Sequence, residues 1–257
     1  MPRTLRTSNP VRQGHPLNQG CVAWWLTLPH TQGTATWFDL MGSYHGTLTN
    51  MSNANNGWRP THRPGAYRHV LLDGVSTTSG YVQCRSSAIL SGKSNWVIAA
   101  WVKTTSSYAN TRPIYCERGA TGNDILKMDS NISPTLVGFG VTYRNDAGNL
   151  IQLFGATPMN DGIWHRGMLV FTGTAFSVFF DGRLDATATW ASSNTLTDAV
   201  QCRIGSDAGD SSNNFQGEID GVKLWTGNLL AISNQAAFAA FDYDQSSRGN
   251  PDTLNYL

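Results

Sequence analysis

The sequence has few charged residues and almost no glutamate. Charged side chains make up 14% of the 257 residues, well below the quarter that is usual in globular domains, and Glu117 and Glu218 are the only glutamates. Glycoside hydrolysis needs two carboxylates that face each other across the scissile bond. Glu117 and Glu218 lie far apart in the chain, and their one close acidic neighbour is Asp220. We therefore expect no enzymatic activity.

Long apolar runs and a strong charge bias are also missing. No apolar stretch approaches the roughly 18 residues that indicate a membrane-spanning helix. The first twenty residues contain arginines but no apolar segment of the kind a signal peptide has. The net charge is +1, which gives no electrostatic reason to expect a nucleic-acid partner. We expect a chain without a membrane span and without an export signal.

Cysteine and histidine are sparse and poorly spaced for metal binding. The four cysteines form no C-x-x-C pair, so zinc-ribbon and thioredoxin-like sites are excluded. We expect free, mostly buried thiols, and one disulfide remains open if the protein works outside a cell. The six histidines include no pair two or four residues apart, which argues against a zinc site.

Turn-forming and β-forming residues are abundant, and they are clearest between residues 161 and 182. Met168 and Val170, and then Phe176, Val178 and Phe180, alternate as one face of a strand does. The following Asp-Gly pair, 181–182, is a strong hairpin signal, because a type I′ turn needs positive φ at both central residues. This stretch predicts consecutive antiparallel strands.

Similar short strands recur along the chain and predict an all-β sandwich or barrel. One short helix is expected at 233–241, where Ser233 is a suitable N-cap and the next residues have high helix propensity. We divide the chain into an N-terminal arm (1–19), one domain (20–241) and a C-terminal tail (242–257).

Charge is unevenly distributed between the two ends of the sequence. Residues 1–70 carry six arginines against one aspartate, and residues 181–257 carry ten acidic against four basic side chains. One interpretation is drift in loop composition. The other is that the arm, through Arg3, Arg6 and Arg12, meets an acidic surface on a neighbouring subunit, which predicts a homo-oligomer.

Several motifs occur in an order that resembles a known superfamily. They are Gly-Cys-Val-Ala-Trp-Trp (20–25), His-Gly-Thr-Leu (45–48), Leu-Asp-Gly (72–74), Asp-Gly-x-Trp-His (161–165), Phe-Phe-Asp-Gly-Arg (179–183), Arg-Ile-Gly (203–205) and Gly-Glu-Ile-Asp-Gly-Val-Lys-Leu-Trp (217–225). The order resembles the laminin G-like, concanavalin A-like jelly-roll superfamily, in the branch related to pentraxins and laminarinase-type glycosidases. The resemblance implies a two-sheet antiparallel jelly-roll sandwich with one short C-terminal helix.

The tryptophans and His165 have competing interpretations as core and as ligand-binding residues. We expect Trp96, Trp164 and Trp225 to fill the core, and His165 to be a hydrogen-bonded structural residue. Trp58 and Trp190 lie in polar, loop-like surroundings, so they are our candidates for exposed platforms that bind a glycan.

Calcium is the one cofactor that the resemblance implies. Related proteins hold a structural ion with an aspartate in the position that Asp220 occupies, and carbonyls around Asp39 or Gly46 would complete the site. The alternative is that Asp220 caps a loop through hydrogen bonds. The oxygen-rich loop 207–214 is a second candidate, although most such loops are solvated turns.

These observations favour a non-catalytic recognition and assembly module. The arm and the tail segment 248–255 resemble single-module proteins encoded among bacteriophage structural genes, which implies a decoration or adhesion protein on a virion surface. Its partners would be other virion or surface proteins, and cell-surface glycans. The alternatives are an extracellular calcium-dependent lectin and, third, a glycoside hydrolase.

Overall fold

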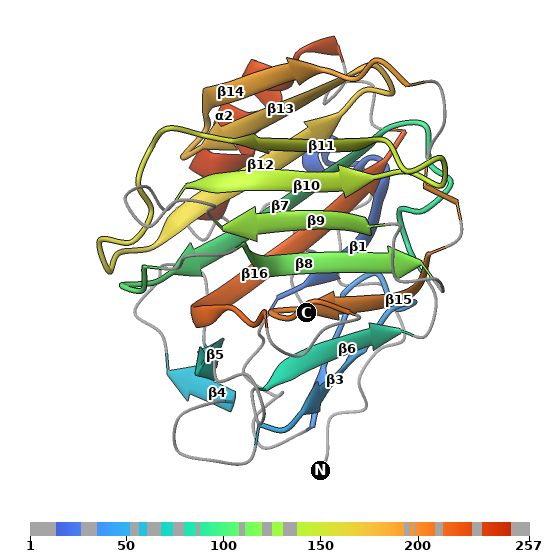
Figure 1. Ribbon diagram of the computed structural model, residues 1–257. Helices are drawn as coiled ribbons and strands as arrows, with labels where there is room; N and C mark the ends of the chain where they lie inside the picture. The colour runs from blue at the N-terminus through green and yellow to red at the C-terminus, as the bar shows by residue number, and fades with distance from the viewer. Residues whose placement is uncertain are drawn as a thin grey trace.

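The chain folds into two antiparallel β-sheets stacked face to face, with one helix outside them (Figure 1). This arrangement confirms the predicted sandwich. The computed structural model describes residues 14–26, 35–51, 57–60, 68–73, 80–85, 88–107, 111–119, 125–130, 138–192, 196–197, 199–208, 213–227 and 233–247. Within these residues each sheet has eight strands.

The first sheet runs in the order β14-β13-β12-β7-β16-β5-β4, and β1 also pairs with β16. Its strands are β14 (Arg183–Thr189), β13 (Ala175–Phe180), β12 (His165–Phe171), β7 (Trp96–Lys103), β16 (Gln216–Thr226), β5 (Arg68–Asp73), β4 (Gly57–Pro60) and β1 (Cys21–Trp25). The central pair, β7 and β16, joins segments more than a hundred residues apart, so the sheet assembles through long-range contacts.

The second sheet runs in the order β11-β10-β9-β8-β15-β6-β3-β2. Its strands are β11 (Leu150–Phe154), β10 (Phe139–Arg144), β9 (Ile125–Ser130), β8 (Arg112–Gly119), β15 (Ala199–Ile204), β6 (Tyr81–Arg85), β3 (Gly46–Thr49) and β2 (Thr36–Trp37). Strands β8 to β11 follow one another as hairpins. Strand β15 enters from far along the chain between β8 and β6, as the crossing connections of a jelly roll require.

The core between the sheets is rich in aromatic rings. Trp96 packs on Phe171 and Phe176, with ring centroids 5.4 and 6.0 Å apart, so its predicted core position is confirmed. Trp225 is also buried, but it lies on the outer side of the first sheet. Trp164 is only half-buried. The prediction for Trp164 is wrong because β12 begins one residue later, which leaves this tryptophan in the preceding turn.

The β13–β14 hairpin follows the predicted turn chemistry. Asp181 has φ of 46° and Gly182 has φ of 79°, and these are the only two residues between the strands. Positive φ at both central positions is the signature of a type I′ turn, whose twist matches that of the flanking strands. The predicted hairpin between β13 and β14 is therefore confirmed.

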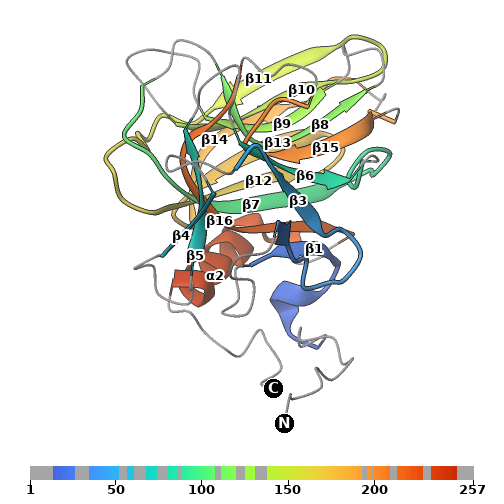
Figure 2. The same ribbon diagram turned by 90° about the horizontal axis from the view of Figure 1, so that it is seen from below.

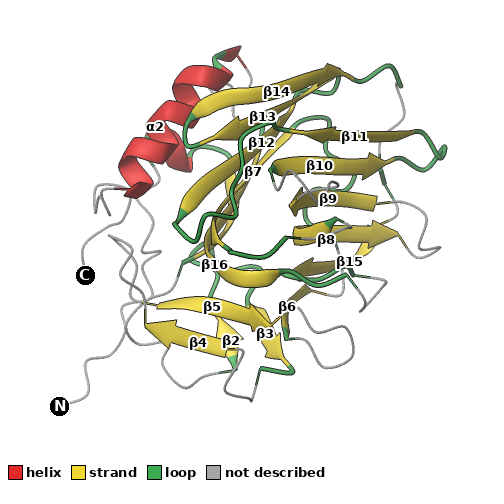
Figure 3. Cartoon of the chain, turned by 60° about the vertical axis from the view of Figure 1, so that its left-hand side comes forward, coloured by secondary structure: helices red, strands yellow, loops and turns green. Residues whose placement is uncertain are grey.

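The outer face of the first sheet is covered by both ends of the described chain. Helix α2 (Gln235–Ser247) lies on the side away from the second sheet (Figure 2, Figure 3). The 3-10 helix η1 (Pro16–Asn18) joins it there through Leu17, while strand β1 continues the first sheet beside β16. Phe238 of α2 is fully buried and packs edge-on against Trp225, with centroids 5.4 Å apart. This second apolar cluster joins the helix to the first sheet, so the molecule has a third layer on the outer side of that sheet.

Both predicted boundaries of the domain need correction. Leu17 and Asn18, which we assigned to the arm, are buried, and their carbonyl and amide oxygens accept hydrogen bonds from Lys223 Nζ at 2.9 Å. Helix α2 continues to Ser247, and Asp242, which we assigned to the tail, is buried within it. These residues belong to the domain because they satisfy buried partners in it.

Three further predictions concern the chain ends, the cysteines and membrane-spanning segments. Arg3, Arg6 and Arg12, and the tail beyond residue 247, lie outside the described residues. All four cysteines are free and buried, as expected. Among the described helices, none has the length and apolar character needed to cross a membrane.

Candidate functional site

The carboxylate of Glu117 is used in structural hydrogen bonds. Its carboxylate is fully buried and accepts hydrogen bonds from the backbone N–H groups of Ile89, Leu90 and Ser91 at 2.7–2.9 Å, and from the hydroxyl of Tyr115 at 2.6 Å. Burial raises the pKa of Glu117, and these four bonds oppose that rise. The carboxylate has no face open to a substrate.

Glu218 is no better placed for catalysis. It forms an ion pair with Lys103 Nζ at 3.0 Å across the β7–β16 pair. Asp220, two residues on, is fully buried and pairs with Trp101 in the sheet. The two glutamates lie on different sheets, so they do not form a pair across a common ligand.

His165 is structural, as predicted. Its Nδ1 lies 2.8 Å from Asp181 Oδ2 and its Nε2 lies 3.0 Å from Asp161 Oδ1. Burial alone would lower the pKa of this imidazole, but the two aspartates outweigh burial and raise it. His165 thus ties the loop before β12 to the β13–β14 turn.

The carboxylate of Asp39, one of the residues predicted near a calcium ion, is not free to bind it. Both oxygens of Asp39 are occupied, since they accept hydrogen bonds from the N–H groups of Trp24, Met41, Ser43 and Tyr44 at 2.7–3.0 Å. Gly46 lies in β3 of the second sheet. Asp220 lies in β16 of the first. The described residues contain no cluster of three acidic, histidine or cysteine side chains for a metal. Calcium binding stays a prediction that this residue set does not support.

Neither candidate tryptophan is an exposed platform. Trp190 is 7% exposed and packs edge-on against Tyr143 and Phe176. Trp58 is half-buried in β4 and packs edge-on against Trp37, with centroids 5.8 Å apart. The predicted exposure of Trp190 is wrong because residues distant in sequence enclose its ring.

A row of polar side chains crosses the outer face of the second sheet. These residues are registered opposite one another from β2 to β11 and alternate with core residues, so they point away from the first sheet. We call this set the polar row. It consists of Thr36, Thr47, Gln83, Arg203, Cys116, Lys127, Thr142 and Gln152.

A buried charge cluster lies at the centre of the polar row. Asp207 accepts from Arg118 Nη1 and Lys127 Nζ, each at 2.6 Å. Burial opposes the charge of Lys127, but Asp129 and Asp207 outweigh burial and raise its pKa. Asp207 belongs to the oxygen-rich loop that we considered for a metal, and two cations already occupy its carboxylate.

Asp129 is the least satisfied member of this cluster. It is fully buried, and neither carboxylate oxygen has a hydrogen-bond donor in good geometry among the described residues. Burial raises its pKa to about 6, although Lys127 and Thr142 act to lower it. A buried acid whose pKa is raised in this way marks a candidate functional position.

An aromatic ring lies next to Asp129 on the same face. Gly140 pairs with both Asp129 and Phe154, and any side chain on Gly140 would collide with the Phe154 ring. The glycine thus lets the half-buried ring lie over strand β10. The outer face therefore combines polar groups with one aromatic surface.

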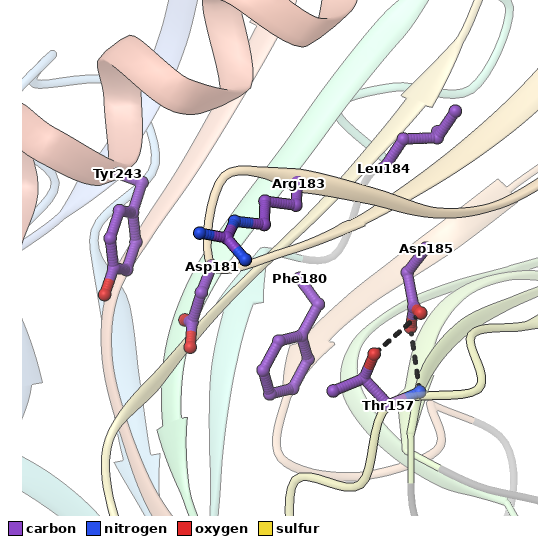
Figure 4. Close-up of a pocket in the computed structure, with 7 residues that line it drawn as sticks. All are labelled: Thr157, Phe180, Asp181, Arg183, Leu184, Asp185 and Tyr243. Atoms are coloured by element: carbon purple, nitrogen blue, oxygen red, sulfur yellow. Dashed lines mark hydrogen bonds between the residues drawn. The ribbon is translucent and has the colours of Figure 1, made fainter.

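A pocket of about 400 Å³ opens where the β13–β14 turn meets helix α2 (Figure 4). Its lining residues come from the loop after β11, from both sides of the turn and from the helix. They are Thr157, Phe180, Asp181, Arg183, Leu184, Asp185 and Tyr243. The polar row lies on the outer face of the second sheet, whereas this pocket lies at the neighbouring edge of the sandwich, where β11 and β14 are the outermost strands.

The sequence matches a laminin G-like family model over residues 76–231, and that family is described as the concanavalin A-like lectin/glucanases superfamily. The chain belongs to this superfamily. The match covers more than half of the chain and agrees with the observed jelly roll. No curated protein sequence matches the chain.

Solved structures of other proteins that resemble this concanavalin A-like chain in fold include carbohydrate-binding and enzymatic proteins. Domain 4 of AbnA, a GH43 extracellular arabinanase from Geobacillus stearothermophilus in complex with arabinotriose, has a TM-score of 0.59 at 16% identity, over 85% of this chain and 98% of that one. The botulinum neurotoxin serotype D ligand binding domain in complex with N-acetylneuraminic acid has a TM-score of 0.61 at 10% identity, over 90% and 52%. The Trypanosoma rangeli sialidase in complex with the inhibitor DANA has a TM-score of 0.54 at 13% identity, over 86% and 32%.

These likenesses show the fold alone, because the identities are low. The chain spans about half the length of the neurotoxin domain and about a third of the sialidase. The superfamily contains both binding domains and glycosidases, so the activity of this member must be argued from its own residues.

The candidate residues that sequence reasoning missed are Lys127, Asp129 and Phe154 on the second sheet, and Arg183 in the pocket. Lys127 and Asp129 alternate with the core residues Leu126 and Met128. That alternation was a usable signal for two outward-facing charges in one strand. What it lacked was the register, which alone brings Asp207 to Lys127.

Proposed function

We propose that this chain is a non-catalytic carbohydrate-recognition module whose ligand face is the outer face of the second sheet. The observation that carries the proposal is the polar row, with Phe154 beside it. Its exposed and half-buried members present amide, hydroxyl and guanidinium groups in register on both sides of the buried charge cluster. Hydroxyl-rich ligands need both donors and acceptors, and an aromatic ring supports their apolar faces.

The contrast with the other outer face supports this assignment. The first sheet buries its outer side under η1 and α2, so a ligand has no access to it there. The family description and the sugar complexes of similar structures are consistent with a glycan ligand.

A glycan array probed with the full chain tests the proposal. Gln152 is exposed at one end of the polar row, and losing one hydrogen bond to a ligand weakens binding by about threefold to tenfold. We expect Gln152→Ala to weaken the strongest array signals to that extent. Gln235→Ala, the same change on helix α2, is the matched control and should leave them unchanged. Equal effects of both variants, or no glycan bound by the parent chain, would contradict the proposal.

Glycoside hydrolysis is the second candidate, favoured by Asp129 and Asp207 on one face. The raised pKa of Asp129 suits a general acid. However, both carboxylates are at most 2% exposed, and Asp207 is held by two cations. Release of reducing ends from a polysaccharide that binds on the array, abolished by Asp129→Asn, would establish this activity in place of simple binding.

We further propose that the module serves on a virion surface as a decoration or adhesion protein. The support is the basic sequence around Arg3, Arg6 and Arg12, ahead of a C-terminal third rich in acidic residues. Since residues 16–18 pack on the domain, the arm to delete is 1–13. This deletion should leave the thermal unfolding of the sandwich unchanged and abolish incorporation into particles. Incorporation that survives it would contradict the arm proposal.

A further inference from the structure

We propose that the pocket beside helix α2 is a second binding site, which takes a single neutral sugar unit. It is distinct from the polar row, which lies on the other sheet, and it does not depend on that face binding a glycan. Its volume of about 400 Å³ falls within the range of small-molecule sites, about 300–1,000 Å³.

The walls of this pocket are fixed before any ligand arrives. Gly182 lies so close to α2 that an added Cβ would meet Ala240 Cα and Tyr243 Cβ at 3.1 Å. Asp181 accepts a hydrogen bond from the Arg166 N–H at 2.7 Å and one at 2.8 Å from His165. The turn is thereby tied to both the helix and strand β12. A preformed pocket spares a ligand the cost of ordering it.

The opposite wall is held in the same way. Asp185 accepts hydrogen bonds from Thr157, at 3.2 Å from its N–H and at 2.8 Å from its hydroxyl. The carboxylate lies against Gly155, where any side chain would collide with it. Figure 4 shows Asp185 and Thr157 joined on one side and Tyr243 on the other, with Arg183 between them.

Arg183 is the group that lacks a partner. It is exposed and makes no hydrogen bond or ion pair within the part of the chain that the structure describes. The two carboxylates two residues away on either side direct their bonds elsewhere. Its guanidinium therefore offers a fork of donors to a ligand.

The charge pattern selects the ligand class. A free anion in the pocket would meet Asp181 and Asp185, and a free cation would meet Arg183. A neutral ligand with several hydroxyl groups satisfies both kinds of group, since each hydroxyl donates and accepts. The half-buried ring of Phe180 adds an apolar surface for the face of a sugar ring.

Tyr243 completes the donor set. Burial raises the pKa of its hydroxyl above 10.0, Asp181 raises it further, and Arg183 lowers it in part. The phenol therefore keeps its proton at neutral pH and donates to a ligand. Its ring packs against Trp101, with centroids 5.8 Å apart, which fixes the position of the hydroxyl.

NMR titration of the full ¹⁵N-labelled chain tests the pocket. The probes are D-glucose, D-galactose and D-mannose as neutral sugars, with glucuronate and glucosamine as the charged arms. We expect one or more neutral sugars to shift the amide signals of residues 181–185 and 157, with a Kd in the millimolar range. The charged analogues should bind at least about tenfold more weakly, a difference of roughly 1.4 kcal/mol.

Three variants separate a true site from a fold defect and from the ligand face. Arg183→Gln and Tyr243→Phe should each weaken the sugar by about threefold to tenfold without altering the other amide signals. Lys93→Gln removes the same charge at an exposed turn far from the pocket and should have no effect. Gln152→Ala should leave the pocket titration unchanged even where it removes array binding. Shifts by glucuronate alone, by glucosamine alone, or by none of the probes would overturn the proposal.

Discussion

The two outer faces of the sandwich are built from opposite kinds of side chain. The first sheet turns Val97, Ala99 and Met168 outward and buries them under η1 and α2. The second sheet turns Lys127, Asp129 and Thr142 outward in the corresponding positions. Both groups are buried, but burial stabilises the first group and costs free energy in the second.

The two sheets therefore contribute differently to the stability of the molecule. Apolar burial is the main stabilising contribution to a fold, and the first sheet collects it on both of its sides. A buried charge cluster is weak evidence for stability, since desolvation offsets most of the attraction. Retaining one on the second sheet is consistent with a role in recognition.

Breaking the apolar cover should give the largest effect. Phe238→Ala removes a fully buried ring that packs on Trp225, and such truncations cost about 3–5 kcal/mol. Urea unfolding followed by tryptophan fluorescence measures the loss. Gln152→Ala, at an exposed position of the second sheet, is the comparison and should change the unfolding free energy by less than about 0.5 kcal/mol. A loss for Phe238→Ala below 1 kcal/mol, on the same approximate scale, would mean that α2 is not an integral layer.

Removing the poorly hydrogen-bonded carboxylate of Asp129 on the second sheet should stabilise the chain instead of destabilising it. The pKa of Asp129 is raised from 3.8 to about 6 in the folded state, so the folded chain binds more protons than the unfolded chain between these values. Stability is then highest below pH 4 for this group and is lost as the pH rises through 6. Asp129→Asn should stabilise the chain by about 2–3 kcal/mol at pH 7.5 and by much less at pH 4.

The measurement is denaturant unfolding of both proteins at the two pH values. Thr142→Val is a useful second variant, because it removes the hydroxyl that lowers the pKa of Asp129 and should raise that pKa further. Destabilisation by Asp129→Asn that is larger at pH 7.5 than at pH 4 would contradict this expectation and show that the carboxylate makes a net favourable contribution as a charge.

The comparison also shows which features the sequence could reveal. The β13–β14 turn was predictable because its two residues, Asp181 and Gly182, encode their own positive φ. The jelly roll was predictable from alternation and from the order of motifs. The extents of η1 and α2 were not, because Leu17 and Asp242 join the domain through partners more than seventy residues away.

Site residues were harder to predict than the fold for the same reason. Trp190 looked exposed because its sequence neighbours are polar, yet Tyr143 and Phe176 enclose it. The ion pair between Lys127 and Asp207 joins β9 to the loop after β15, and only the strand order places them together. Local composition carries no information about such register-dependent contacts.

A smaller effect is expected at His165, a polar residue at the start of β12 in the first sheet. The pKa of His165 is raised by Asp181 and Asp161, so its contribution is fully present below about pH 6.5 and is lost as the pH rises through the folded pKa. Asp181→Asn, which tolerates positive φ at this turn, should lower the pKa of His165. The difference in stability between pH 5.5 and pH 9 should narrow by about 1 kcal/mol. The C2–H proton shift of His165 in NMR measures the pKa directly, and an unchanged value would show that Asp181 does not control it.

Removing calcium should have the smallest effect on stability of these tests. If the resemblance-based site around Asp220, Asp39 and Gly46 held an ion, its removal would loosen the β1–β16 side of the first sheet. The four N–H groups that bind Asp39 instead predict that EDTA leaves the thermal midpoint unchanged. Asp39→Asn should lower the midpoint equally with and without calcium, since an amide presents donors where only acceptors fit. A midpoint that falls in EDTA and recovers with CaCl₂ in the parent chain, but not in Asp39→Asn, would restore the predicted calcium site and with it the calcium-dependent lectin.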